Sequence, residues 1–186
     1  MSALRLVARL FVHHTRKITG EPYVTHLYGT AHIVSQLAND NDVRVAALLH
    51  DVLEDIPANE YSADQLQADF GPRVLELVRT VTHDVQTHGP DEARRLYIEQ
   101  LRSGPPAASL ISGADMLYNG YDMLHAYAVN PQQATQVFGG ESAVRREKFW
   151  HGRFEVIETK LGSEHPLVKQ LQPVMKEIDA FHDKIR

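Results

Sequence analysis

Apolar residues recur along this chain with the spacing of α-helices, and no stretch alternates apolar and polar residues as a half-buried strand would. From residue 26 to residue 37, apolar side chains return every three or four positions, which predicts a helix with one buried face. Residues 43–55 are apolar nearly all round until the last turn. The pattern predicts one continuous helix there, buried in the middle of the fold.

The remaining segments have the same helical spacing, punctuated by glycine, proline and capping residues. The Gly-Pro-Pro run at 104–106 and the Gly-Gly pair at 139–140 indicate loops rather than linkers, because the segments beside them are too small to form separate cores. We therefore expect an all-α fold, with residues 1–186 forming one helical-bundle domain. The further helices predicted are 3–14, 62–70, 73–82, 91–102, 107–128, 141–161 and 166–185, and the main loops are 15–22, 39–42 and 83–90.

Composition narrows the class of protein. The net charge is −5 and the basic residues are scattered, which argues against a nucleic-acid or membrane-surface partner. The chain has no cysteine, so disulfides, thiolate nucleophiles and thiolate-bound zinc are excluded. No apolar run reaches the roughly 20 residues that a membrane span needs. Arg5 and Arg9 interrupt the N-terminal segment where a signal peptide would be apolar, so we expect a cytoplasmic protein.

Candidate chemistry is concentrated in the run His50-Asp51-Val52-Leu53-Glu54-Asp55. On a continuous helix, His50 and Glu54 would lie one turn apart on the same face, as would Asp51 and Asp55. Burying these charged groups at the end of an apolar helix is costly unless something compensates the charge. A divalent cation would compensate three carboxylates.

Two other helices can contribute to the same site. His26 lies on the apolar face of its predicted helix and is expected to point inward. Asp115, Asn119 and Asp122 lie together on the shoulder of the buried face of theirs. Two imidazoles and two carboxylates suit manganese, magnesium or iron better than structural zinc. Each of these residues alone has an ordinary structural explanation, but their joint order and inward placement favour a metal site.

Four segments carry a resemblance to a known family. They are residues 16–26, with Arg16-Lys17 and Gly20-Glu21-Pro22-Tyr23-Val24-Thr25-His26; residues 46–55, with His50-Asp51 and Glu54-Asp55; residues 70–82, with Phe70-Gly71-Pro72-Arg73-Val74; and residues 114–119, with Ala114-Asp115-Met116-Leu117-Tyr118-Asn119. Together they resemble the HD hydrolase domain of the RelA/SpoT family, most closely the stand-alone small alarmone hydrolases. The similarity extends from about residue 7 to residue 157.

The resemblance implies a hydrolase, without a synthetase domain, that removes the 3′-pyrophosphate of guanosine tetra- and pentaphosphate, normally with one manganese ion. The metal ligands it implies are His26, His50, Asp51 and Asp115. Glu54 and Asp55 would orient and deprotonate the attacking water. Arg16, Lys17 and Asn119 would contact the nucleotide or its phosphates.

The sequence departs from the family pattern near the last of these ligands. Ser112 and Gly113 replace the usual Lys-Leu, Tyr121 replaces an arginine, and Leu27 replaces a proline. Two positive charges are therefore missing. This leaves two alternatives open: a phosphohydrolase acting on another phosphorylated nucleotide, such as an NADPH 2′-phosphatase-like enzyme, or a nucleotide-binding module with weakened turnover.

Overall fold

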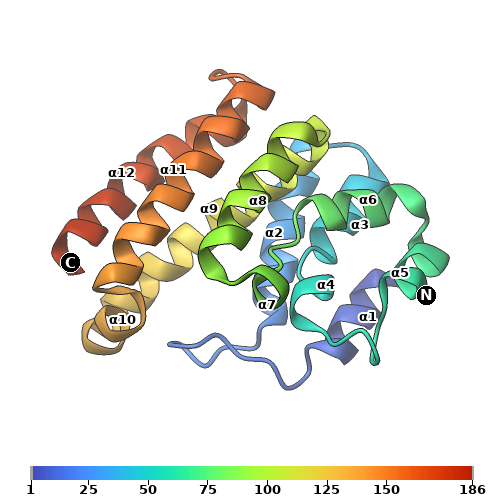
Figure 1. Ribbon diagram of the computed structural model, residues 1–186, viewed down its shortest axis with the longest axis horizontal. Coiled ribbons are helices and arrows are strands. Elements are labelled where there is room, and N and C mark those ends of the chain that lie inside the picture. Colours follow the sequence, from blue (N-terminus) through green and yellow to red (C-terminus); the bar gives the residue numbers. More distant parts are fainter. Residues whose placement is uncertain (1, 186) are drawn as a thin grey trace.

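The computed structural model describes residues 2–185, without the side chains of residues 141 and 142. The regular secondary structure of this part of the chain is helical apart from one isolated bridge between Thr15 and Pro22 (Figure 1). The predicted all-α class is confirmed. None of the described helices is both long enough and apolar enough to cross a bilayer. The helices are α1 (Ala3–Leu10), α2 (Val24–Leu37), α3 (Asn41–Leu48), α4 (Val52–Asp55), α5 (Ala63–Phe70), α6 (Pro72–Thr80), α7 (Val85–His88), α8 (Pro90–Ser103), α9 (Pro106–Val129), α10 (Pro131–Phe138), α11 (Glu141–Leu161) and α12 (Pro166–Ile185).

The predicted continuous helix over residues 43–55 is wrong, because the chain breaks between α3 and α4. Nδ1 of His50 donates to the carbonyl oxygen of Ala47 at 2.7 Å. In a continuous helix that oxygen would accept the backbone N–H of Asp51. The side chain of His50 thus occupies a carbonyl oxygen that a backbone N–H would bind in a continuous helix. The backbone turns at residues 49–51. The turn orients His50 and Asp51 toward the same point, although they are neighbours in the sequence.

One other helix end differs from the prediction, and two helices were not predicted. Helix α1 ends at Leu10 rather than near residue 14, and the chain turns into a loop where the backbone N–H of His14 donates to Phe11. Helices α7 and α10 lie in segments without a predicted helix. Their signals are local caps: Asp84 accepts from the backbone N–H of Thr87 at 3.0 Å, and Asn130 begins α10 in the same way.

Helix α9 is the central element and packs against α2, α3, α11 and α12 (Figure 1). Its glycines let α12 approach closely. A Cβ atom at Gly113 would lie 2.7 Å from Leu167, and one at Gly120 would lie 2.6 Å from Val174. A side chain larger than hydrogen at either position would therefore push α12 away from α9.

The loop between α1 and α2 folds back on itself as a short hairpin. The backbone N–H of Arg16 donates to Glu21 at 2.8 Å, and that of Tyr23 donates to His14 at 2.9 Å. The Tyr23 ring stacks on Phe11, with centroids 5.3 Å apart. This packing fixes the loop at the end of α2 that carries His26.

Candidate active site

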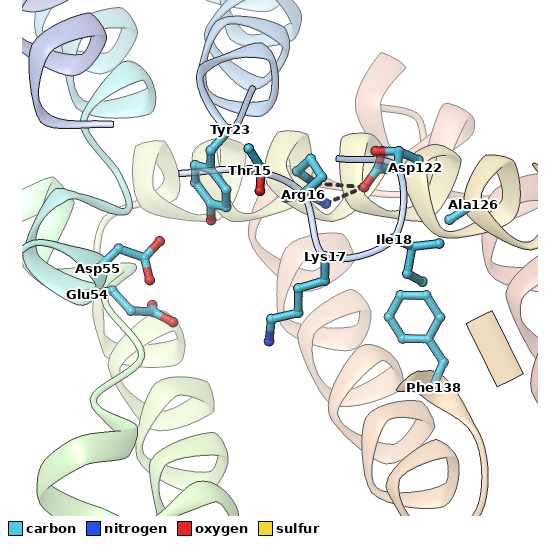
Figure 2. Close-up of a pocket in the computed structure, with 11 residues that line it drawn as sticks. Thr15, Arg16, Lys17, Ile18, Tyr23, Glu54, Asp55, Asp122, Ala126 and Phe138 are labelled. Atoms are coloured by element: carbon cyan, nitrogen blue, oxygen red, sulfur yellow. Dashed lines mark hydrogen bonds and ion pairs between the residues drawn. The ribbon is translucent and has the colours of Figure 1, made fainter. Parts of the chain in front are cut away.

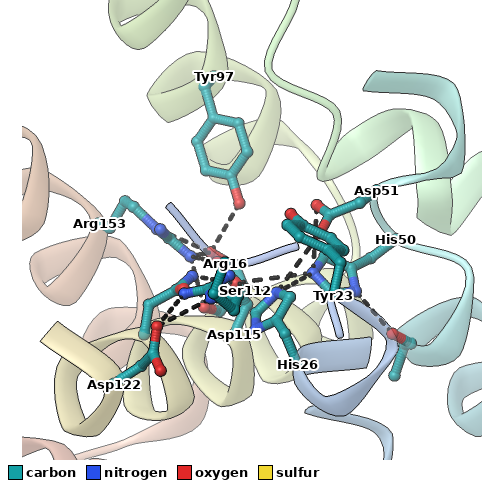
Figure 3. A network of polar contacts seen from close by, with 12 residues as sticks. Arg16, Tyr23, His26, His50, Asp51, Tyr97, Ser112, Asp115, Asp122 and Arg153 are labelled. Carbon is teal, nitrogen blue, oxygen red and sulfur yellow. Dashed lines mark hydrogen bonds and ion pairs between the residues drawn. The ribbon is translucent and has the colours of Figure 1, made fainter. Parts of the chain in front are cut away.

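Four side chains from three parts of the fold converge at one point (Figure 3). His26 comes from α2, His50 and Asp51 come from the turn between α3 and α4, and Asp115 comes from α9. The two Nε2 atoms of the histidines are 3.1 Å apart. Nε2 of His50 lies 3.2 Å from Oδ1 of Asp51, and Nε2 of His26 lies 3.3 Å from Oδ1 of Asp115. The structure thus brings together all four residues predicted to bind the metal.

The tautomer of His50 suits metal binding. Because Nδ1 of His50 donates to a carbonyl, its Nε2 atom presents a lone pair to the cluster when the ring is neutral. Oδ2 of Asp51 accepts from the Tyr23 hydroxyl at 2.8 Å, which holds that carboxylate in place. Both histidines are buried. His26, His50 and Asp51 form a possible metal site. Oδ1 of Asp115 lies 3.3 and 3.6 Å from the two imidazole Nε2 atoms and can add a second carboxylate of the kind that divalent cations bind.

Charge in the cluster is balanced between acids and bases. Burial opposes a charge on His50, but Asp51 and Asp115 outweigh it and raise its pKa to about 9. Burial likewise opposes ionisation of Asp115, but Arg153 and the two histidines hold its pKa well below the usual range. In the absence of a cation, a proton shared by the two facing imidazoles therefore offsets part of the carboxylate charge. A metal and this proton compete for the same nitrogen atoms.

Asp115 is held by two donors from outside the cluster. Asn119 donates to its Oδ1 at 2.6 Å, and the buried Arg153 on α11 donates to its Oδ2 at 2.7 Å. Arg153 also donates to the carbonyl oxygen of Ser112 at 2.6 Å, and the Tyr97 hydroxyl donates to Oγ of Ser112 at 2.9 Å. A positive charge thus returns next to Ser112, where the usual lysine is missing, but from another helix.

Sequence reasoning missed Arg153. Its only signal is position: it lies three residues after Trp150 and four before Ile157, on the buried face of α11. Sequence reasoning also gave Tyr23 no role in the site. It packs on Phe11, but it also donates to Asp51.

Glu54 and Asp55 lie on α4 and line a cavity of about 330 Å³. Lys17 faces them across this cavity (Figure 2). Oε2 of Glu54 accepts the backbone N–H of His83 at 3.0 Å. Burial and the nearby Asp51 raise the pKa of Glu54 to about 8, and the same two causes raise that of Asp55. Asp51 and Asp55 lie one turn apart as predicted, since Asp51 is the N-cap residue of α4 and its carbonyl oxygen accepts the backbone N–H of Asp55 at 2.9 Å. The predicted pairing of His50 with Glu54 on one continuous helix is wrong, because His50 lies in the turn before α4.

Arg16 connects the cavity to α9. Its Nε donates to Oδ2 of Asp122 at 2.8 Å, and its Nη2 donates to Oδ1 of Asn119 at 2.8 Å. Asn119 therefore joins Arg16 to Asp115. The predicted substrate residues Arg16 and Asn119 contact each other, and Lys17 lines the cavity together with Arg16. Asp122, which had no predicted role, orients the guanidinium.

The structure is thus that of an all-α protein with a buried His/Asp cluster next to a pair of carboxylates. The chain belongs to the HD domain family, whose model matches residues 3–136. It is similar to human guanosine-3′,5′-bis(diphosphate) 3′-pyrophosphohydrolase MESH1, with 32% identity over 160 residues that cover 85% of this chain and 82% of the relative. The enzyme of the same name from Drosophila melanogaster is 33% identical over 158 residues, which cover 84% of this chain and 80% of that relative.

The chain is also similar to a protein of known structure. It is described as a metazoan ortholog of SpoT that hydrolyses ppGpp and plays a role in starvation responses, and it matches with a TM-score of 0.76 and 28% identity. The match covers 94% of this chain and 92% of that one. The resemblance drawn from the four sequence segments is confirmed.

Proposed function

We propose that this chain is a metal-dependent hydrolase that removes the 3′-pyrophosphate of guanosine tetra- and pentaphosphate, with manganese at the His/Asp cluster. The observation that carries the proposal is the convergence of His26, His50, Asp51 and Asp115 beside the carboxylates of Glu54 and Asp55. The relatives named as pyrophosphohydrolases support the choice of substrate.

The metal would be held by two imidazoles and two carboxylates, and when bound it would lower the pKa of a water molecule and offset phosphoryl charge. Glu54 accepts the proton from the attacking water. In the metal-free protein burial and Asp51 raise its pKa to about 8, so it must first lose its own proton, which the positive charge of a bound cation would favour. Asp55, its neighbour in the cavity, orients the water.

Basic side chains make the cavity acceptable to a phosphate, which the carboxylates alone would repel. Lys17 faces Glu54 and Asp55 and places an ammonium group where the cleaved pyrophosphate lies. Arg16 is already oriented by Asp122, so its guanidinium loses little freedom when it binds. Asn119 holds Arg16 and Asp115 in a fixed relation.

The test is incubation of guanosine tetraphosphate with the wild-type chain and Mn²⁺, followed by measurement of released pyrophosphate. We expect release that Asp51→Ala abolishes by loss of the metal and that Glu54→Ala abolishes while the metal stays bound. The control Glu60→Ala, at an exposed carboxylate beyond α4, keeps full turnover.

A parallel assay of phosphate release from NADPH decides the substrate. Phosphate from NADPH without pyrophosphate from guanosine tetraphosphate would replace the proposed substrate. Tight binding of either nucleotide without any turnover would indicate a binding module. Unchanged turnover in Asp51→Ala or Glu54→Ala would refute the assigned roles.

A further inference from the structure

A second cavity, of about 270 Å³, lies beside the candidate active site and has an unusual number of arginines in its wall. They come from the loop before α2, from α8 and from α11. Asp122 is the one carboxylate in the wall among the described residues. We call this cavity the arginine pocket; it is lined by Arg16, His83, Arg94, Asn119, Asp122, Met123, Phe138, Arg146, Phe149, Trp150 and Arg153.

The positive charge of the arginine pocket is only partly balanced. Arg16 pairs with Asp122, and Arg153 pairs with Asp115. The carboxylate that pairs with Arg94 belongs to Asp91 and is 66% exposed, so it neutralises Arg94 from the outer surface.

Arg146 has no carboxylate within ion-pair distance among the described residues. Its Nη1 donates to the carbonyl oxygen of Phe138 at 2.9 Å, and its guanidinium lies over the Phe138 ring. Phe138 thereby fixes the guanidinium in the wall without neutralising it. The arginine pocket thus has cationic charge that nothing in the described chain compensates.

The titration of neighbouring groups agrees with an excess of positive charge. Burial and the proximity of Arg94 lower the pKa of Arg146 to about 10. Burial, Arg94 and Arg153 lower the pKa of His83 to about 4. The Nε2 atom of His83 is buried and has no hydrogen-bond partner. An anion in the pocket would relieve the repulsion between the arginines.

The arginine pocket adjoins the candidate active site. Arg16, Asp122 and Phe138 line both this pocket and the cavity that contains Glu54. Asn119 and Arg153 line the pocket and also donate to Asp115 in the His/Asp cluster. A single substrate molecule can therefore reach both sites around the side chain of Arg16.

We propose that the arginine pocket binds a second phosphate or pyrophosphate group of the substrate, one that is not cleaved. Guanidinium groups bind phosphate oxygens with paired, charge-assisted hydrogen bonds, and Arg94 and Arg146 are available for this. This inference rests on the proposed function, for which the second group is the 5′-diphosphate of guanosine-3′,5′-bis(diphosphate). The pocket would make the enzyme selective for nucleotides that carry phosphates at both positions.

The first experiment compares two substrates, guanosine tetraphosphate and guanosine 3′-diphosphate, which lacks the 5′-phosphates. For the intact substrate, Arg146→Gln should raise KM about tenfold and leave kcat within about twofold, because a charge-assisted hydrogen bond is lost. Arg94→Gln should raise KM less, since Asp91 already pairs with the charge of Arg94. Neither variant should change KM for the shortened substrate by more than about twofold. Arg95→Gln, next to Arg94 but outside the pocket wall, is the matched control and should leave both KM values unchanged.

An equal rise in KM for both substrates, or no rise in either variant, would overturn the proposal. Thermal unfolding of each variant identifies those that fail to fold. If Arg146→Gln fails to fold, Arg94→Gln still tests the pocket.

A second experiment separates this proposal from the proposed function. Inorganic pyrophosphate is titrated into EDTA-treated protein by calorimetry, so no turnover is needed. We expect binding that Arg146→Gln weakens about tenfold and that Arg95→Gln leaves unchanged. Unweakened binding in both Arg146→Gln and Arg94→Gln would overturn the pocket even if hydrolysis is observed. Weakened pyrophosphate binding with no change in KM for guanosine tetraphosphate would indicate a site for free anions and would also overturn it.

Discussion

Asp115 carries a carboxylate that is stabilised inside the protein by neighbouring groups of opposite charge. It lies between the imidazoles of His26 and His50 on one side and the guanidinium of Arg153 on the other. A buried charge is tolerated only when it is paired and hydrogen-bonded. Arg153 therefore positions Asp115 both when the imidazoles are protonated and when they bind a metal ion.

Replacing Arg153 by methionine tests this pairing. We expect a loss of about 3–5 kcal/mol in the free energy of unfolding, because the carboxylate of Asp115 stays buried without its partner. The measurement is urea unfolding of metal-free protein. In an Asp115→Asn background the same change should cost much less, because there is no buried charge left to expose. An equal cost in both backgrounds would show that Arg153 acts through packing alone.

Residues with chemical signatures could be predicted from the sequence, and residues without them could not. The order of His26, His50-Asp51 and Asp115 suffices to propose one site, because each lies on or beside an apolar face. Arg153 has no motif, and its partner is 38 positions away in the chain. Only tertiary packing shows that the missing lysine charge is supplied from α11.

At the scale of elements, the site depends on how closely α2 and α9 approach each other. Gly29 on α2 faces the Tyr118 ring on α9, and a Cβ atom at Gly29 would overlap that ring. His26 lies one turn before Gly29, and Asp115 lies one turn before Tyr118. A side chain at position 29 would therefore separate two of the residues predicted to bind the metal.

Gly29→Ala should destabilise the fold by about 1–3 kcal/mol through overpacking and should also weaken Mn²⁺ binding. Gly152→Ala on α11 is the matched control, since its Cβ atom would meet Ile98 at an ordinary 3.4 Å. There we expect no loss of stability, because alanine favours a helix over glycine. Thermal unfolding and Mn²⁺ titration measure both effects. Equal tolerance of the two substitutions would contradict the close packing of α2 on α9.

The break between α3 and α4 marks the limit of pattern reading for elements. An apolar segment without polar interruptions predicts a continuous helix, and nothing in its periodicity indicates residues 49–51 as a turn. At the break, the side chain of His50 donates to the carbonyl oxygen of Ala47, a contact that the sequence pattern does not reveal. Most other helices were predicted because long periodic segments are a strong signal, whereas α7 and α10 depend on local caps.

For the whole molecule, the fold brings side chains from α2, α9 and the turn before α4 to one point, where we propose that a cation binds. Periodicity predicts these helices but not which of them pack together. A cation that binds only this folded arrangement stabilises it in proportion to the logarithm of its concentration. Under the proposed function, metal binding, catalysis and stability would therefore be linked through the same four side chains.

Counting bound manganese tests this claim most directly. After equilibrium dialysis against Mn²⁺ and metal analysis, we expect one ion per chain in the wild type and none in His26→Gln or Asp51→Asn. Glu54→Gln should retain one ion, since its proposed role is proton transfer. A wild-type chain without manganese, or full occupancy in both His26→Gln and Asp51→Asn, would contradict a metal site at the cluster.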